Sequence, residues 1–137
     1  MMLLVALVVP WTSKAQDLVD YDFSTGTDAS RWITLSNSAT SIWTTYQDDV
    51  ASSLYNIGFS FPFGMATYTQ FSVNSNGNFR LGSTVIASSY YSTPFSSTNV
   101  TQNTPKIVGI GRDLGTGSNG YVKYQLTGTA PERVLVC

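Results

Sequence analysis

The chain has 137 residues, which suits one domain, and its seven Lys and Arg residues nearly balance eight Asp and Glu residues, for a formal net charge of −1. This balance excludes the basic surface with which a nucleic-acid partner's phosphates are neutralised. The chain has no His, and its single Cys is Cys137. An intramolecular disulfide and any His-based catalytic or metal site are therefore excluded.

Residues 1–16 have the composition of a secretory signal peptide. An apolar run, Met2–Val9, is followed by small and polar residues that predict cleavage near Ala15 or Gln16. The run is far shorter than the roughly 20 residues that cross a bilayer, so we expect no membrane span in the mature chain. No Lys or Arg precedes the run, which indicates an atypical signal or one that is incomplete at its start. An ordinary buried strand is the alternative.

The segment from Asp17 to Asp49 is acidic. It holds six of the eight acidic residues of the chain: Asp17, Asp20, Asp22, Asp28, Asp48 and Asp49. Ca²⁺ binds carboxylate oxygens, but no spacing here matches a D-x-D-x-D-G loop, so we predict solvated loop charges and no cofactor. Asp48 and Asp49 would point to opposite faces of a strand, which does not suit a catalytic carboxylate pair. Within the segment, Trp32–Leu35 and Ile42–Tyr46 are rich in β-branched and aromatic residues and predict short strands.

Residues 57–82 predict an antiparallel meander of three strands. The first strand places an apolar residue at every second position, which puts all four on one face: Ile57, Phe59, Phe61 and Phe63. Pro62 cannot donate a ladder hydrogen bond, so this strand is expected at a sheet edge or at an irregularity.

The second and third strands of the meander follow the same period. Phe71 and Val73 are expected to face inward, while the polar residues between and beside them face outward: Gln70, Ser72 and Asn74. Asn76-Gly77 then predicts a tight hairpin, because both residues tolerate positive φ. Phe79 and Leu81 continue the inward face on the partner strand.

This stretch resembles a known module. The run F-x-F-G, followed by Y-T-x-F-S-V-N-S-N-G-x-x-R-L-G, is similar to a β-rich module of secreted and surface proteins of Bacteroidetes-type bacteria, and distantly to the nidogen-like domain. The resemblance extends from about Asp48 to Val136. In both groups a Pro-Phe-Trp-Asp-Asp-Leu-like segment follows the next strand. Here that segment is residues 109–114, which lack the Trp and keep one acid, Asp113. The resemblance implies an extracellular adhesive or accessory module and gives no catalytic residues.

Further short strands are predicted after the meander. They are Thr84–Ile86, a central strand at Lys106–Ile110, a half-exposed strand at Val122–Leu126 and a last one at Arg133–Val136. With about nine or ten short strands between regular turns and no helical period, the sequence predicts an all-β, antiparallel, jelly-roll-like β-sandwich. We expect residues 17–137 to form one such domain that continues beyond the given sequence, because the last strand has barely begun.

The predicted function is that of a non-catalytic module, secreted or on the outer cell surface, that serves adhesion or structural display. An accessory domain of a secreted hydrolase, carbohydrate-binding or protease-associated, is the alternative. Tyr90 and Tyr91 lie in a polar loop, Ser88–Gln102, and are the candidate anchors for an extracellular glycan or protein ligand, because Tyr offers both apolar area and a hydroxyl. The other interpretation is that one of the two rings packs under its own loop.

Overall fold

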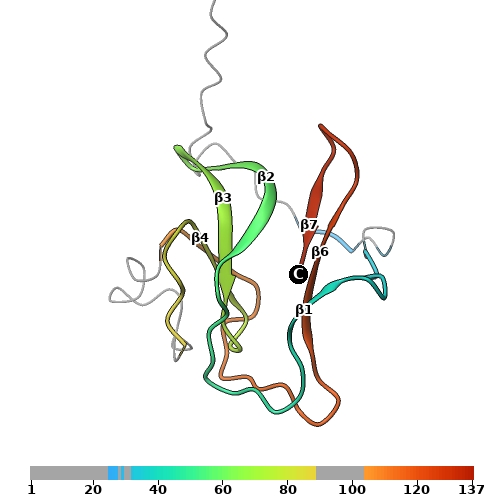
Figure 1. Ribbon diagram of the computed structural model, residues 1–137, viewed down its shortest axis with the longest axis vertical. Helices are drawn as coiled ribbons and strands as arrows, with labels where there is room; N and C mark the ends of the chain where they lie inside the picture. Colours follow the sequence, from blue (N-terminus) through green and yellow to red (C-terminus); the bar gives the residue numbers. More distant parts are fainter. Residues whose placement is uncertain (1–24, 28, 30–31, 89–103) are drawn as a thin grey trace, which may run out of the picture.

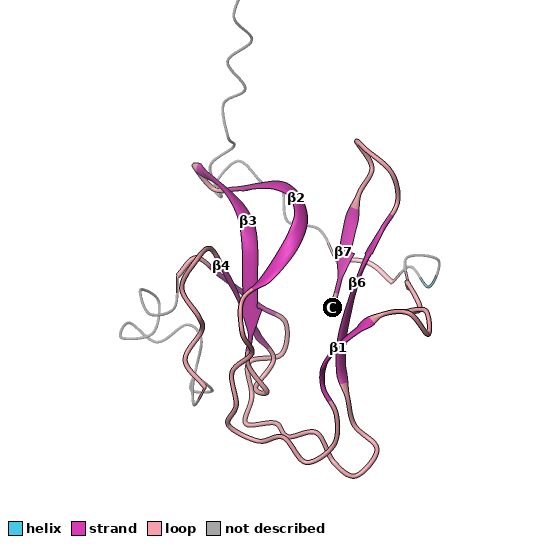
Figure 2. Ribbon diagram, viewed as in Figure 1, coloured by secondary structure: helices cyan, strands magenta, loops and turns pink. Residues whose placement is uncertain are grey.

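The computed structural model describes residues 25–27, 29, 32–88 and 104–137, which form two antiparallel sheets. The three-stranded sheet has the order β1-β6-β7, from β1 (Thr40–Trp43), β6 (Val122–Thr127) and β7 (Val134–Val136). The four-stranded sheet has the order β2-β3-β4-β5, from β2 (Tyr55–Phe63), β3 (Ala66–Val73), β4 (Asn78–Leu81) and β5 (Lys106–Val108). The two sheets stand opposite each other (Figure 1), and the described residues contain no α-helix (Figure 2). The predicted all-β sandwich is therefore confirmed.

An aromatic cluster holds the two sheets together. Phe71 on β3 is fully buried and stacks on Phe79 of β4, with ring centroids 4.6 Å apart and planes 6° apart. Across the gap between the sheets, Tyr124 of β6 meets Phe71 edge to face at 5.3 Å and lies 5.0 Å from the Tyr55 ring. Edge-to-face and offset aromatic pairs add to the gain from apolar burial, so these rings fix how the sheets face each other.

Strand β2 has the predicted alternation and the predicted place. Ile57 is buried and the apolar residues that follow at every second position are half-buried, while the residues between them are exposed. β2 is the edge strand of its sheet, and its register with β3 shifts between Asn56 and Phe61. Both expectations drawn from Pro62 are confirmed, because a residue without an N–H is tolerated at an edge or beside an irregularity.

Strand β3 departs from the predicted alternation, because both of its faces are covered at its end. Ser72 and Asn74 were expected to face solvent, yet they are only 0% and 3% exposed. The loop after β4 lies over them: the Ile86 amide donates to Ser72 Oγ (2.9 Å), and Asn74 Nδ2 donates to the Ala87 carbonyl (3.0 Å). The four-stranded sheet thus has a second, smaller layer of backbone on its outer face.

The number of strands was predicted too high. Seven strands lie in the described residues, and the expected strands at Trp32–Leu35 and Thr84–Ile86 are irregular there. Ile86 lies in a loop and is only 2% exposed, so its apolar side chain indicates a packed position and not a strand. Among the described residues, β5 is an edge strand of three residues and not a central one. It ends at Val108 because the Gly109 and Ile110 amides turn to the Gly77 carbonyl (3.1 and 3.4 Å).

The hairpin between β3 and β4 lies where it was predicted but has a different turn. Gly77 has a φ of +77°, whereas Asn76 is outside the positive-φ region, so only one residue of the pair uses it. The Gly77 amide donates to the Asn74 carbonyl (3.3 Å), and the Asn74 amide donates to the Asn78 carbonyl (3.1 Å). This is a loop of three residues that ends in a left-handed glycine, the next commonest hairpin after the two-residue type.

Replacing Gly77 with Val should lower the free energy of unfolding by about 1–3 kcal/mol, because a β-branched residue is strained at positive φ. The new Cβ would also lie 3.1 Å from the Ile110 Cβ. Chemical denaturation of the two proteins measures the difference. Gly117→Val is the matched control, since a Cβ there meets nothing within 4 Å. Equal losses at both positions would show that the hairpin does not depend on Gly77.

Candidate functional site

Two loops pass from one sheet to the other at the same end of the molecule. The first, residues 44–54, leads from β1 to β2, and the second, residues 109–121, leads from β5 to β6 (Figure 1). We call them the crossover loops. Thr116 joins the two loops through three hydrogen bonds. Its amide donates to the Gln47 carbonyl (2.8 Å), and its carbonyl accepts from the Tyr46 amide (2.6 Å). Its Oγ1 accepts from the Gln47 amide (2.8 Å). The two loops therefore run side by side although neither contains a regular strand.

The buried side chain of Asn76 joins both crossover loops to the β3–β4 hairpin. Asn76 is 0% exposed. Its Nδ2 donates to Asp49 Oδ1 (3.1 Å) in the first loop, and its Oδ1 accepts from the Leu114 amide (2.8 Å) in the second. Its own carbonyl accepts from the Arg112 amide (3.2 Å). An amide side chain supplies a donor and an acceptor at once, which is what two different loops require here.

Two further asparagines support the hairpin from within. Asn74 Oδ1 accepts from both the backbone amide and the Nδ2 of Asn78, each at 3.1 Å. Asn78 Nδ2 also reaches the Asn76 carbonyl at 3.3 Å. Asn74 and Asn78 are 3% and 2% exposed. Buried polar groups need hydrogen bonds, and these bonds join the two side chains to each other and to the turn.

Three carboxylates come together on the outer side of this network. Asp48, Asp49 and Asp113 are exposed, and one carboxylate oxygen of each lies within 4.8 Å of the others. The prediction that Asp48 and Asp49 point to opposite faces of a strand is wrong. They lie in a crossover loop, where Asp49 has a φ of +48°, so the rule of strand alternation does not hold. The three oxygens are of the kind that Ca²⁺ binds, and they number about half of the six to eight that it takes.

Two exposed tyrosines flank the crossover loops. Tyr46 is 76% exposed, and Tyr121 is 62% exposed, with the Lys123 ammonium 4.7 Å from the centroid of its ring. The backbone of Tyr46 is fixed by its hydrogen bond to Thr116, so its ring extends from a held position. Tyr90 and Tyr91, the predicted anchors, lie outside the described residues.

Sequence reasoning found parts of this site and missed how they meet. Asp48, Asp49 and Asp113 were each considered, but nothing in the sequence indicates that residues 48 and 113 are neighbours. The central role of Asn76 was also missed, because Asn-Gly is read as a turn in which the side chain faces solvent. The available signal was the repeated asparagine in N-S-N-G-N, residues 74–78.

Two facing antiparallel sheets, joined at one end by hydrogen-bonded crossover loops, define a β-sandwich module. The sequence profile of the NIDO-related family matches residues 20–137, and the chain belongs to this family. The distant nidogen-like resemblance is thus confirmed, whereas the bacterial origin stays a prediction. No curated protein and no solved structure matches the chain. Membership in the family indicates an extracellular module. The part of the chain that the structure describes contains no helix long and apolar enough to cross a membrane.

Replacing Asn76 with Ala should lower the free energy of unfolding by about 1–3 kcal/mol, because the Leu114 amide then loses its acceptor in a part-buried place. Chemical denaturation measures the loss. Asn119→Ala, at an exposed asparagine in the second crossover loop, is the matched control and should change little. A loss at Asn76 no larger than the loss at Asn119 would contradict the central role of the Asn76 amide.

Replacing Asp113 with Asn should raise the melting temperature in low salt without divalent cations, because it removes one of three like charges that lie close together. The gain should shrink in 1 M salt, where the Debye length falls to about 3 Å. Glu132→Gln removes an exposed acid outside the cluster and serves as control. A loss of stability that salt does not alter would mean that the Asp113 carboxylate makes a contact the fold requires.

Proposed function

We propose that this protein is a non-catalytic extracellular module that serves adhesion or structural display, and that it binds an extracellular glycan or protein. The observation that carries the proposal is membership in the NIDO-related family over residues 20–137. We further propose that residues 1–16 direct secretion and that the protein is secreted or held at the outer cell surface.

The crossover loops support this proposal as a contact surface. They present two exposed tyrosine rings, Tyr46 and Tyr121, and the backbone of Tyr46 is held in place by its hydrogen bond to Thr116. Tyr supplies a large contact area at a small cost in side-chain entropy, and a held backbone further lowers the ordering that binding requires. Tyr90 and Tyr91 remain the anchors proposed from the sequence, so the chain offers two candidate surfaces.

A comparison of paired variants on arrays of defined glycans and of extracellular proteins tests the proposal. If the crossover loops bind, Tyr46→Ala/Tyr121→Ala should abolish retention on the array, because aromatic anchors carry much of the contact energy. If the Ser88–Gln102 loop binds, Tyr90→Ala/Tyr91→Ala should do so instead. Trp32→Ala removes an exposed ring, 82% accessible, from another place and is the matched control.

The melting temperature of every variant completes the test. It should stay within a few degrees of that of the unchanged protein, since exposed rings contribute little to the core. Retention that survives both paired changes would contradict these surfaces, and the absence of retention of the unchanged protein on every array would contradict a binding role. A large fall in the melting temperature of Tyr90→Ala/Tyr91→Ala would show that these rings are packing residues.

A further inference from the structure

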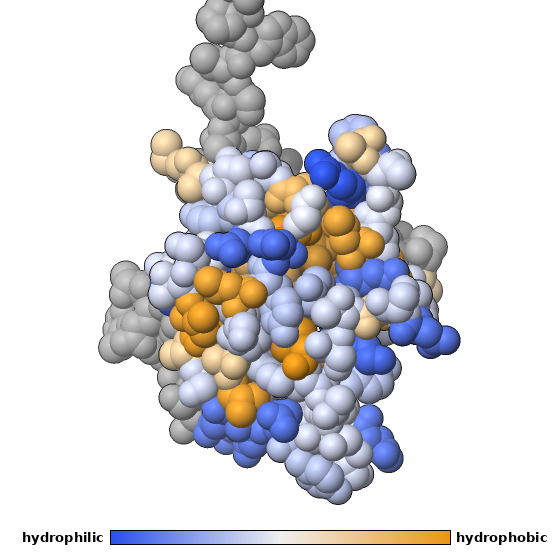
Figure 3. All heavy atoms as spheres, in the orientation of Figure 1, coloured by the Kyte–Doolittle hydropathy of each residue, from blue (hydrophilic) through white to orange (hydrophobic). Residues whose placement is uncertain are grey.

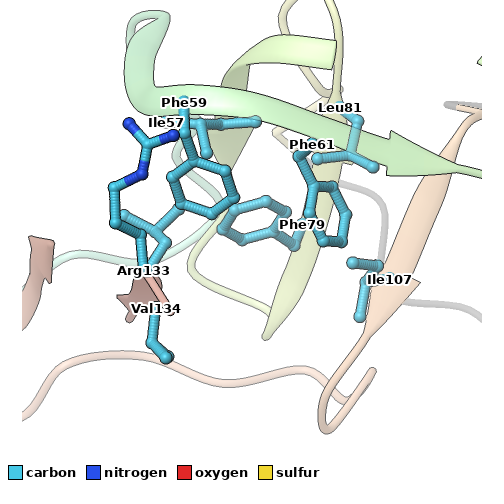
Figure 4. A pocket seen from close by; sticks show the side chains of 9 residues that line it. Ile57, Phe59, Phe61, Phe79, Leu81, Ile107, Arg133 and Val134 are labelled. Carbon is cyan, nitrogen blue, oxygen red and sulfur yellow. The ribbon is translucent and has the colours of Figure 1, made fainter. Parts of the chain in front are cut away.

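An apolar pocket opens between the two sheets at the edge formed by β7. It has a volume of about 240 Å³, and Figure 4 shows the residues that line it. The most buried of them, Ile57 and Leu81, are 2% and 1% exposed. Ile107 and Val134 also line it and are 40% and 45% exposed, so they mark its mouth. Apolar atoms reach the surface between the sheets on this face (Figure 3).

Three phenylalanine rings give the pocket an aromatic lining. Phe59, Phe61 and Phe79 stand in a row between Arg133 at one end and Ile107 at the other (Figure 4). The Phe59 and Phe61 rings meet nearly at right angles, with planes 82° apart. A planar ring among them gains offset or edge-to-face contacts, which add to the gain from apolar burial. A cavity of about 150 Å³ already takes a benzene ring, so this pocket has room for one ring and a short tail.

The charge of the pocket is positive. Of the nine described residues that line it, Arg133 alone is charged. Its guanidinium lies 5.2 Å from the centroid of the Phe59 ring, and its Nη1 donates to the Gly58 carbonyl (3.2 Å). These two contacts hold the guanidinium at one end of the row of rings. The bond to Gly58 uses one of five N–H donors, and a carboxylate can accept from a pair of the others in bidentate geometry.

We propose that this pocket binds a small aromatic carboxylate, with the ring of the ligand against Phe61 and Phe79 and its carboxylate on the Arg133 guanidinium. Arg133 is exposed, so the bound carboxylate keeps part of its water and the cost of desolvating the ion pair is lowered. The pocket shares no lining residue with the crossover loops, so this inference goes beyond the proposed function and does not rest on it.

Titration of the full chain with hydrocinnamate, a phenyl ring with a short carboxylate tail, tests the proposal. The NMR shifts of the amides at residues 57–61 and 133–135 should change, with a dissociation constant in about the micromolar to millimolar range. Arg133→Gln should weaken binding about tenfold or more, because the charge-assisted hydrogen bonds to the carboxylate are lost. Arg112→Gln makes the same change at an exposed arginine outside the pocket and should leave the affinity unchanged.

The neutral amide of hydrocinnamate separates the charge of Arg133 from its packing on Phe59. The amide should bind the unchanged protein about tenfold or more weakly than the carboxylate does, and Arg133→Gln should not weaken it further, because the two changes remove the same interaction. Hexanoate has the charge but no ring, so it should bind more weakly than hydrocinnamate.

A bulky side chain at the mouth places the ligand. Val134→Trp should abolish the binding of hydrocinnamate, whereas Val85→Trp, at a position 42% exposed outside the pocket, should not change it. The melting temperatures of both variants show that they fold. The proposal is overturned if hydrocinnamate shifts no amide of residues 57–61 or 133–135, or if its amide or hexanoate binds as tightly. Unchanged binding by Val134→Trp would also overturn it, because the ligand would then lie elsewhere.

Discussion

The arrangement of the loop end depends on the two hydrogen bonds of one amide side chain. Asn76 donates to Asp49 and accepts from the Leu114 amide, and these two partners belong to loops that form no sheet with each other. Backbone groups outside regular strands still need partners when water is excluded, and here side chains of Asn76 and Thr116 supply them. A hydroxyl or a carboxylate at position 76 could not donate and accept in the same two directions, which explains why an asparagine fits.

Two different kinds of interaction therefore stabilise the sandwich. Phe71, Tyr124 and their neighbours set the distance and angle between the sheets through apolar contact, which has little directional preference. The asparagine network then fixes the loops through directional bonds, which have one good arrangement. Because the network is buried and Asn76 bonds to both loops, the loops gain a defined shape without regular secondary structure. Tyr46 extends from this shaped backbone, so its position follows from residues that lie far from it in the sequence.

The sequence was informative where the structure depends on near neighbours. The alternation of Ile57, Phe59 and Phe61 was enough for β2, and Gly77 was enough for the place of the hairpin, because period and backbone freedom are local properties. The edge position of β5 and the irregular path near Ile86 depend on what packs against them, and a short apolar run does not reveal that. The meeting of Asp48 with Asp113 depends on the course of both crossover loops, so no local pattern contains it.

The apolar pocket lies between the larger sheet and the β7 edge of the smaller one. Its lining comes from β2, β4 and β5 on one side and from residues 133–135 on the other. Phe61 of β2 contacts the Phe59 and Phe63 rings along its own strand and also lines this pocket. Each square ångström of apolar surface removed from water is worth about 25 cal/mol. Any segment that completes the smaller sheet at β7 therefore gains both backbone hydrogen bonds and this apolar contact, whereas a segment at the β1 edge would gain the hydrogen bonds without the pocket.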